Sequence, residues 1–353
     1  VDELIVNKYL IDCGTVVSQQ MGRRPSELRV NGTENLVAVI SWRRARLDIA
    51  LITADNKIAF RDQIPLTEEE DKVDKITSTF FNIMKPKVGD KRIMGLCIII
   101  PGIIDAENKR ILSTVIGVGY SDPVVQRFEE AFHDYPFCLL NDTACFAYAE
   151  YVFANITEPN FAYINVSKGV GACLFANGKM LRGAGSNATQ FGHFSVDRNG
   201  PLCACGNHGC VERVVGENAL TERAEACGID LTRFAGRKPL YCDIGAMAED
   251  GDAHAKELIK DLAVDLSFAI SNLITLFNPS LVVIGGMGVN LGPFFLSNIR
   301  DEVQNSGFKE FVSNTWIQYS TLGLDSELGG AARYYIDHYY DFFEQMQGGL
   351  YAD

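Results

Sequence analysis

The chain has 353 residues, of which 47% are hydrophobic and 22% charged, and its 32 basic and 45 acidic side chains give a net charge of −13 and a pI near 4.9. Such a chain buries more core than one domain normally holds, so we expect two lobes. The acidic balance repels phosphate backbones, which confines any nucleic-acid contact to a local patch. No apolar run approaches the ~20 residues of a membrane span, and no secretory signal opens the chain, so we expect a cytoplasmic protein without membrane contact.

The first residues predict a short helix with an apolar face that runs into a strand. The chain has no initiator Met, and we therefore expect the sequence to begin inside a longer protein. Lys8, Arg23 and Arg24 are local basic residues that could reach phosphates. The alternative is an ordinary N-terminal helix.

Hairpins, buried strands and helices alternate along the rest of the chain. Because hairpins and helices recur in both halves, we predict an α/β protein built from two similar lobes. The predicted elements, in chain order, are a hairpin over 36–60, a buried strand over 93–105, a strand and helix over 137–153, a hairpin over 161–181, a long helix and strand over 252–288, and a closing helix near the C-terminus.

Three cysteines, Cys203, Cys205 and Cys210, lie within the eight residues "CACGNHGC". In a reducing compartment, thiolates this close together usually bind Zn²⁺, which takes four ligands in a tetrahedron, and the glycines let a short loop wrap the ion. His193 and His208 are both candidates for the fourth ligand. Four protein ligands leave no position for a catalytic water, so we expect a structural zinc site. Three free thiols on a surface turn are the alternative.

The stretch "GHFSVDRNGPLCACGNHGCVE" resembles the signature of the ROK family, which unites bacterial sugar kinases and sugar-responsive repressors. "LLNDTACFAYAE", "SKGVGACLFANGKMLRGAGSNATQFGH" and "PSLVVIGGMG" resemble further family segments, so the resemblance covers nearly the whole chain. It implies a two-lobed actin-like, hexokinase-like (ribonuclease H-like) α/β fold with a sugar between the lobes. It also implies zinc held by His193 and the three cysteines, with His208 as a loop residue.

The resemblance fails where the family's kinases bind nucleotide phosphates. Backbone N–H groups must approach the phosphates closely there, which glycine permits. The family motif Asp-x-Gly-Gly-Thr is replaced by Ser41-Trp42-Arg43-Arg44-Ala45. Two arginines and an indole would fill the space of the phosphates, so we expect binding of ATP and Mg²⁺ to be lost. A solvated hairpin turn at Arg43 and Arg44 is equally compatible with that loss.

The resemblance implies that Asn141, Asp142, His193 and Glu212 contact the sugar. In a kinase, Asp142 would be the catalytic general base; otherwise it accepts a hydrogen bond from the ligand, or simply caps the helix that follows. His193 could present one ring nitrogen to zinc and the other to the sugar, and Glu212 could instead be a surface acid. Gln190 stands where the family usually has Glu, which changes the expected sugar preference.

These observations favour a sugar-responsive transcriptional repressor whose ligand is a sugar or sugar phosphate. In repressors of the family a winged helix-turn-helix precedes the sugar domain, and residues 1–25 resemble its end and linker, so we expect operator DNA as a partner and a homodimer or homotetramer. We expect an N-terminal lobe over 26–140 and a C-terminal lobe over 141–353, whose last helix either stays there or returns to the first lobe. The alternatives are an ATP-dependent, glucokinase-like hexose or N-acetylhexosamine kinase and a sugar-binding protein with neither activity.

Overall fold

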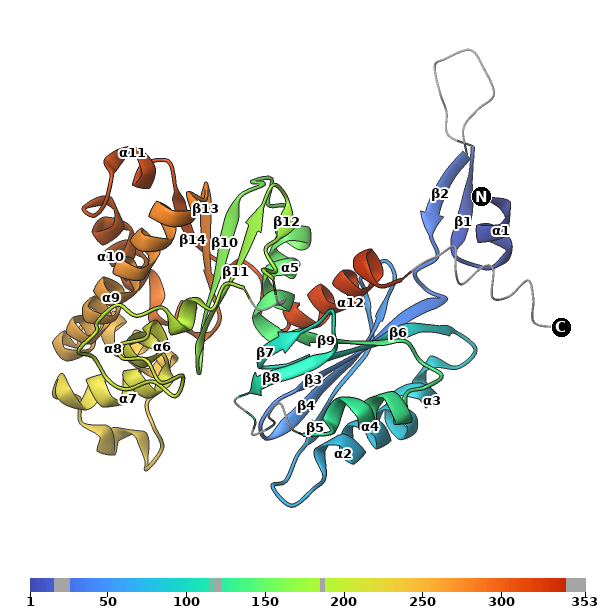
Figure 1. The fold of residues 1–353 in the computed structure, drawn as a ribbon, viewed down its shortest axis with the longest axis horizontal. Coiled ribbons are helices and arrows are strands. Elements are labelled where there is room, and N and C mark those ends of the chain that lie inside the picture. Colours follow the sequence, from blue (N-terminus) through green and yellow to red (C-terminus); the bar gives the residue numbers. More distant parts are fainter. Residues whose placement is uncertain (16–25, 115, 117, 119–121, 185–187, 341–353) are drawn as a thin grey trace, which may run out of the picture. The chain divides into compact units, whose positions relative to one another are not determined.

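A computed structural model describes residues 1–15, 26–114, 116, 118, 122–184 and 188–340 (Figure 1). The chain divides into two compact units. Unit 1 comprises Val1–Val152 together with Asp325–Asp353, and unit 2 comprises Phe153–Leu324. The last described helix therefore belongs to the same unit as the N-terminal half of the chain.

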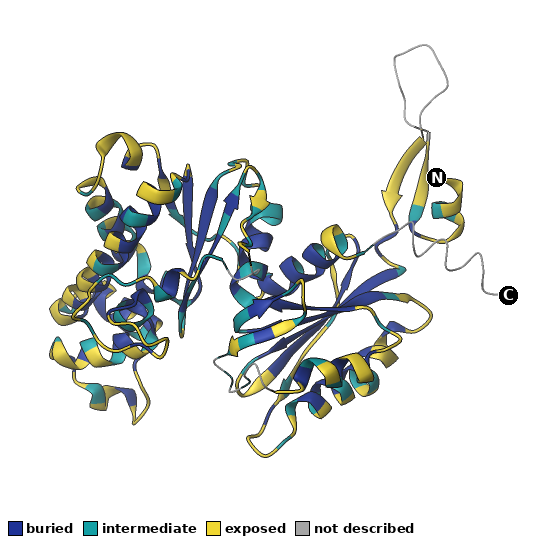
Figure 2. Ribbon diagram, viewed as in Figure 1, coloured by how far each residue is buried: buried dark blue, intermediate teal, exposed yellow. Residues whose placement is uncertain are grey.

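Unit 1 is built on a five-stranded sheet in the order β5-β4-β3-β6-β9. The first three strands form an antiparallel meander, whereas β3, β6 and β9 run parallel. Both β3 and most of β6 are buried along their length, as expected for strands covered on two faces (Figure 2). The strands are β3 (Asn35–Trp42), β4 (Arg46–Thr53), β5 (Ile58–Pro65), β6 (Arg92–Ile100) and β9 (Phe137–Asn141).

Helices cover both faces of this sheet. On one face, α2 and α4 pack apolar residues such as Ile76 and Phe128 against the strands, and on the other α12 packs against β3, β4 and β6 (Figure 1). Asp71 caps α2 by accepting from two backbone N–H groups. The helices are α2 (Lys72–Thr79), the π-helical η1 (Phe80–Met84), α3 (Lys85–Val88), α4 (Val124–Ala131), α5 (Asp142–Phe153) and α12 (Ser326–His338).

Two small hairpins complete unit 1. One is β7 (Gly102–Asp105) with β8 (Arg110–Thr114). The other follows the short helix α1 (Asp2–Val6) and pairs β1 (Leu10–Thr15) with β2 (Ser26–Val30). The expected helix and strand near the N-terminus are thus present, whereas Arg23 and Arg24 lie outside the described residues.

Unit 2 contains a second five-stranded sheet, in the order β12-β11-β10-β13-β14. It repeats the arrangement of unit 1, because an antiparallel hairpin is followed by parallel strands. Asn177 and Gly178 form the turn between β11 and β12, both with positive φ. The strands are β10 (Phe161–Val166), β11 (Val170–Ala176), β12 (Lys179–Met180), β13 (Leu281–Gly285) and β14 (Trp316–Tyr319).

A long helix, α9 (Ala253–Phe277), forms the core of unit 2 with the sheet and the helices beside it. Asp252 caps its start, and Asn278 ends it in the left-handed conformation just before Pro279. The other helices are η2 (Phe191–His193), α6 (Val211–Val215), α7 (Glu217–Ala226), η3 (Leu231–Phe234), α8 (Tyr241–Glu249), η4 (Met287–Leu291), α10 (Gly292–Gln304) and α11 (Lys309–Val312).

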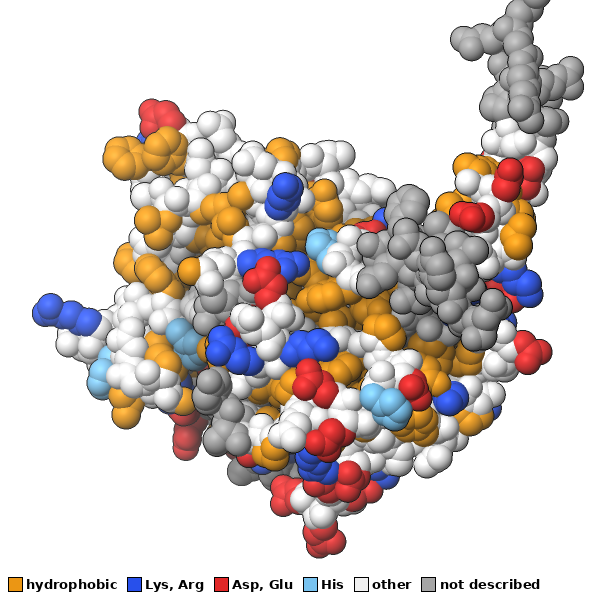
Figure 3. Space-filling model, turned by 45° about the vertical axis from the view of Figure 1, so that its right-hand side comes forward, with side chains coloured by type: hydrophobic (Ala, Val, Ile, Leu, Met, Phe, Trp, Pro, Cys, Tyr) orange, Lys and Arg blue, Asp and Glu red, His pale blue; other side chains and the backbone are white. Residues whose placement is uncertain are grey.

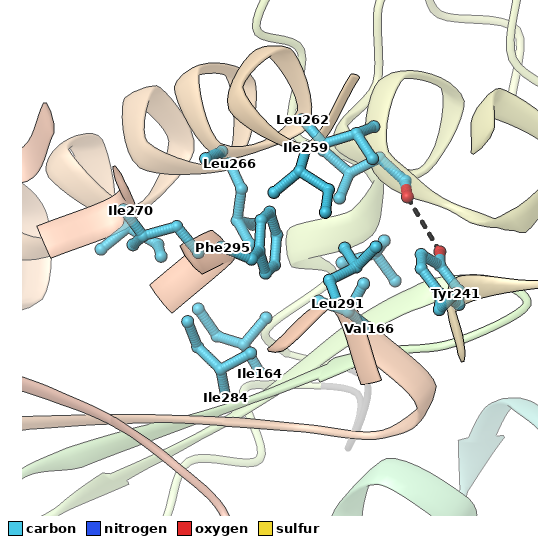
Figure 4. Close-up of a cluster of buried hydrophobic side chains, with 14 of the residues drawn as sticks. Ile164, Val166, Tyr241, Ile259, Leu262, Leu266, Ile270, Ile284, Leu291 and Phe295 are labelled. Atoms are coloured by element: carbon cyan, nitrogen blue, oxygen red, sulfur yellow. Dashed lines mark hydrogen bonds between the residues drawn. The ribbon is translucent and has the colours of Figure 1, made fainter. Parts of the chain in front are cut away.

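Apolar side chains from α9 interlock with those of the sheet and α10 in this core (Figure 4). Ile164 and Ile284 face Phe295 and Leu266 there, and all four are fully buried. Tyr241 is the polar member of the cluster, and its hydroxyl donates to the Val215 carbonyl at 2.9 Å. This bond fastens α8 to the end of α6.

The described surface carries mixed charges. On the face seen in Figure 3, acidic and basic side chains alternate among apolar ones. None of the helices within the described ranges has the length and apolar character that crossing a membrane requires.

Candidate functional site

The carboxyl ends of three parallel strands meet at one edge of the unit 1 sheet. Ser41 pairs with Ile99, and Ile100 pairs with Asn141, so β3, β6 and β9 end at the same level. Side chains that follow parallel strands at this edge commonly form ligand sites in α/β proteins. Asn141 and Asp142 therefore lie where a ligand of this unit is expected.

The side chain of Asn141 already has structural partners. Its Oδ1 accepts from the Ala144 N–H at 3.0 Å, which caps α5, and its Nδ2 donates to the Gly102 carbonyl. The capping role considered for Asp142 is thus filled by Asn141. The Asp142 carboxylate accepts from the Thr143 N–H at 2.8 Å and begins the helix.

The charge of an ion-paired arginine, Arg43, acts on Asp142. Arg43 donates to Glu327 of α12, and its Nε lies 3.4 Å from Asp48 Oδ2. Burial raises the pKa of the Asp142 carboxyl, and the Arg43 charge opposes that shift. Glu327 is only 1% exposed, and burial raises its pKa to about 7 although Arg43 lowers it. The guanidinium of Arg43 is thus paired with Glu327 and Asp48, and its charge also acts on Asp142.

The turn between β3 and β4 differs from its expected shape. Trp42 does not extend into the turn: it is 2% exposed and packs in the core of unit 1. The reason is that β3 is covered on both faces, so every side chain along it is buried. Arg44 is exposed, whereas Arg43 is half-buried and ion-paired. The alternative of a solvated turn therefore describes Arg44 but not Arg43.

In unit 2, His193, Cys203, Cys205 and Cys210 come together. Their ligand atoms all lie within 4.8 Å of one another. The Nδ1 atom of His193 is 3.6 Å from Cys203 Sγ, and Cys205 Sγ is 3.6 Å from Cys210 Sγ. His208 lies outside this group and bonds the Gly200 carbonyl through its own Nδ1 at 3.0 Å. The structure thus selects His193 between the two candidate histidines.

The loop that carries the cysteines is held by backbone bonds. Ser195 bridges to Cys210 and Leu202 bridges to His208, which folds residues 195–210 back on themselves. Gly209 has φ +58°, and a Cβ at this position would collide with the Asp197 backbone. Glycine is therefore required for the close approach that brings Cys210 back toward His193.

The four residues have the chemistry and spacing of a zinc site. Zn²⁺ with Zn–S bonds of about 2.3 Å separates its ligand atoms by roughly 3.7 Å, which is close to the two spacings above. Burial raises the pKa of Cys210 to about 12, so this thiol needs a cation beside it to exist as a thiolate. The residues present therefore fit a tetrahedral metal ion.

Two further candidates lie near this loop. Gln190 is exposed and directly precedes η2, the helical turn that ends in His193. Glu212 is half-buried in α6, and its Oε2 accepts from the Val170 N–H at 3.2 Å. This contact distinguishes Glu212 from an ordinary surface acid, because it ties α6 to β11.

The candidate residues thus form two groups, each within one unit: Asn141 and Asp142 in unit 1, and Gln190, His193 and Glu212 in unit 2. Sequence reasoning missed Glu327, which meets Arg43 from 284 residues away. Glu327 lies in the first turn of a helix rich in apolar and small residues. The helical period predicts a buried position for it, and this sequence signal could have identified it.

Comparison with known proteins identifies one family and several related repressors. The model of the ROK family matches residues 41–337. The chain is 26% identical over 250 residues to the xylose repressor of Bacillus subtilis, which covers 70% of this chain and 62% of that protein. It is 28% identical over 334 residues to a putative xylose repressor of Caldicellulosiruptor sp., covering 91% of this chain and 83% of that one. The chain spans less than two thirds of the Bacillus subtilis relative.

Solved structures share the fold. A ROK family transcriptional regulator, a homologue of the Escherichia coli MLC protein, superposes with a TM-score of 0.79 at 24% identity, over 94% of this chain and 85% of that one. A ROK family glucokinase from Streptomyces griseus, in complex with glucose and AMPPNP, gives 0.69 at 22% identity, over 84% and 98%. The fold is therefore α/β and similar to glucokinase structures, as predicted. Because the family model matches most of its length, the chain belongs to the ROK family.

Proposed function

We propose that this protein is a sugar-responsive transcriptional repressor without phosphotransfer activity. The main support for the proposal is the β3–β4 turn. Glycines would leave room for a phosphate in this turn, but the position is occupied by Arg43, which is paired with Glu327. The relatives named xylose repressor support the same conclusion. A regulator of this kind acts in the cytoplasm.

The effector is a sugar or sugar phosphate bound by both groups of candidate residues. Asn141 and Asp142 contact it from unit 1, and Gln190, His193 and Glu212 from unit 2. The Asp142 carboxylate and the Glu212 carboxylate accept from sugar hydroxyls, while Gln190 can both donate and accept. Binding of the sugar shifts an equilibrium between conformations of the protein.

Zinc is a structural cofactor in this proposal. His193, Cys203, Cys205 and Cys210 hold the ion, which would fix the loop and thereby the imidazole of His193. Its Nδ1 faces the cysteines, so the Nε2 edge is left for the sugar. Zinc therefore supplies no chemistry to the ligand and acts by positioning a contact residue.

Operator DNA is the second partner. Residues 1–25 are the end of a winged helix-turn-helix and its linker in this proposal, and the two lobes that follow correspond to the rest of unit 1 and to unit 2. The pairing of β1 with β2 after α1 supports a wing-like hairpin, and because β2 comprises Ser26–Val30 this hairpin extends beyond residue 25. A homodimer or homotetramer would present two DNA-binding domains, whose relative placement changes when the sugar binds.

Isothermal titration on the zinc-loaded protein tests the proposal. The panel contains D-xylose, D-glucose, N-acetyl-D-glucosamine and their phosphates, with Mg-ATP titrated in parallel. We expect heat from one class of sugar and none from Mg-ATP. Binding of Mg-ATP together with sugar phosphorylation would instead identify a kinase with Asp142 as its general base, and no sugar binding at all would contradict both functions.

A further inference from the structure

Thr189 has an unusual backbone conformation for its residue type. Its φ is +65°, in the left-handed region, where a Cβ lies too close to a backbone carbonyl oxygen and a branched side chain is rare. Among the described residues other than glycine that have positive φ, it is the only β-branched one. Such a conformation persists only where the surrounding structure enforces it, and it occurs most often at functional sites.

The contacts of Thr189 show what enforces this conformation. Its Oγ1 donates to the Ala172 carbonyl at 2.8 Å, which ties the residue to β11. Its own carbonyl accepts from the Phe191 N–H at 2.7 Å, so the chain closes a tight turn around the residue between them. That residue is Gln190, whose φ of −73° and ψ of 55° are those of an inverse γ-turn. The hydroxyl and the carbonyl of Thr189 thus fix the backbone of Gln190.

The residues that follow Gln190 are held against the same strand. Phe191 is 8% exposed and packs in the core of unit 2. A Cβ at Gly192 would collide with the Val170 carbonyl oxygen, so η2 lies directly against the start of β11. The His193 N–H donates to the Gln190 carbonyl at 3.0 Å. Gln190 is exposed, yet its backbone is held on both sides.

Glu212 is fixed to the same point of β11. Its Oε2 accepts from the Val170 N–H at 3.2 Å, and the carbonyl of Val170 meets Gly192. Two candidate sugar contacts of unit 2, Gln190 and Glu212, are therefore both positioned by this strand. The hydroxyl of Thr189 is a side-chain tether between the strand and the turn that carries Gln190.

We propose that Thr189 is a positioning residue, whose left-handed backbone and hydroxyl tether place Gln190 for its contact with the sugar. This inference rests on the proposed function, which assigns Gln190 to the ligand. Because the turn is ordered before the sugar binds, little conformational entropy is lost at this contact on binding. Thr189 therefore raises the affinity for the sugar without touching it.

Thr189→Gly separates the tether from the backbone conformation. Glycine adopts positive φ without strain, so the turn can still form. Loss of the hydrogen bond lowers stability and relief of strain raises it, so the midpoint of urea unfolding should change little. Sugar binding should weaken about fivefold, because the turn is no longer tethered. Thr189→Ser keeps the hydroxyl and should bind sugar like the unmodified protein.

A double-mutant cycle tests whether Thr189 acts through Gln190. Gln190→Ala removes the contact itself and should also weaken sugar binding about fivefold. If Thr189 positions that side chain, adding Thr189→Gly to Gln190→Ala should cause no further loss of affinity. Two losses that multiply, to about 25-fold, would show independent action and overturn the proposal.

The experiment titrates the tightest-binding sugar of the panel into the full chain with zinc, and follows urea unfolding of each variant. Asn177→Gly is the matched control. Asn177 also has positive φ, and it lies in the turn at the other end of β11, so the same change of backbone freedom is made away from Gln190. This control should leave the sugar affinity unchanged.

The outcomes separate the two proposals. Weaker binding by Thr189→Gly at unchanged stability, with full binding by Thr189→Ser and Asn177→Gly, supports the inference. The positioning role is overturned, while sugar binding stands, if Thr189→Gly binds like the unmodified protein, if its affinity and stability fall together, or if Thr189→Ser or Asn177→Gly binds as weakly. Absence of sugar binding by the unmodified protein overturns the proposed function and the positioning role with it.

Discussion

The Nδ1 atom of His193 lies 3.6 Å from the Sγ atom of Cys203. Because this ring nitrogen faces the cysteines, the Nε2 edge of the imidazole points away from them. A metal ion bound at Nδ1 would fix the orientation of the ring and thereby the direction in which Nε2 points. The relationship links the cysteine loop to any ligand that His193 contacts.

Replacing a cysteine of the loop is expected to release zinc. Cys203→Ser exchanges a soft thiolate for a hydroxyl that binds zinc weakly, so zinc affinity should fall by more than about tenfold. Metal content after dialysis checks this by atomic spectroscopy. The matched control is Cys242→Ser, an exposed cysteine on α8 outside the cluster. Equal zinc content in the two variants would contradict the assignment.

Removal of the metal is expected to weaken sugar binding as well as stability. Without zinc the loop of residues 195–210 loses its central link, and His193 is no longer held in one orientation. Loss of one well-placed hydrogen bond corresponds to about 1 kcal/mol, or a five- to tenfold rise in the dissociation constant. Titration of sugar into chelator-treated protein, before and after zinc is restored, measures this effect. An affinity that chelation leaves unchanged would refute the coupling.

The hydroxyl of Tyr241 is expected to contribute to the stability of unit 2. It lies between two carbonyls, 2.9 Å from Val215 O and 3.0 Å from Ser167 O, and Figure 4 draws one of these two hydrogen bonds. Tyr241→Phe leaves these acceptors without their donor, so the free energy of unfolding should fall by about 1–2 kcal/mol. Urea denaturation measures the loss. Tyr135→Phe is the control, because no hydrogen bond is recorded for that hydroxyl within the described ranges, and equal losses would contradict the prediction.

Local patterns were sufficient to predict much of the fold. The hairpins predicted over 36–60 and 161–181 and the long helix predicted within 252–288 all depend on residues close together in sequence. The cysteine spacing likewise predicted a cluster that the structure forms. Residues distant in sequence were not predictable in this way, because the pairing of Arg43 with Glu327 depends on α12 returning to the first sheet.

The same limit explains the error at Trp42. We expected the indole to help fill the space of the phosphates, because sequence alone does not show that helices cover β3 on both faces. Once α12 and α2 are in place, the indole is buried and only Arg43 remains near the ligand edge. Long-range packing, rather than local propensity, decides which side chains of a turn face the site.

Glu327 is expected to make stability depend on pH near neutrality. Its pKa is raised to about 7 in the folded protein by burial, against about 4.5 unfolded, so the folded state binds more protons between these values. Stability should therefore fall as pH rises from about 4.5 to 7 and level off above. Glu327→Gln, which resembles the protonated form, removes this decline and should gain up to about 3 kcal/mol relative to the unmodified protein between pH 5 and pH 8. Urea denaturation at pH 5 and at pH 8 measures the free energy of unfolding of both proteins. Glu310→Gln, on the exposed surface, is the control. The same change with pH in the unmodified protein and in both variants would contradict the prediction.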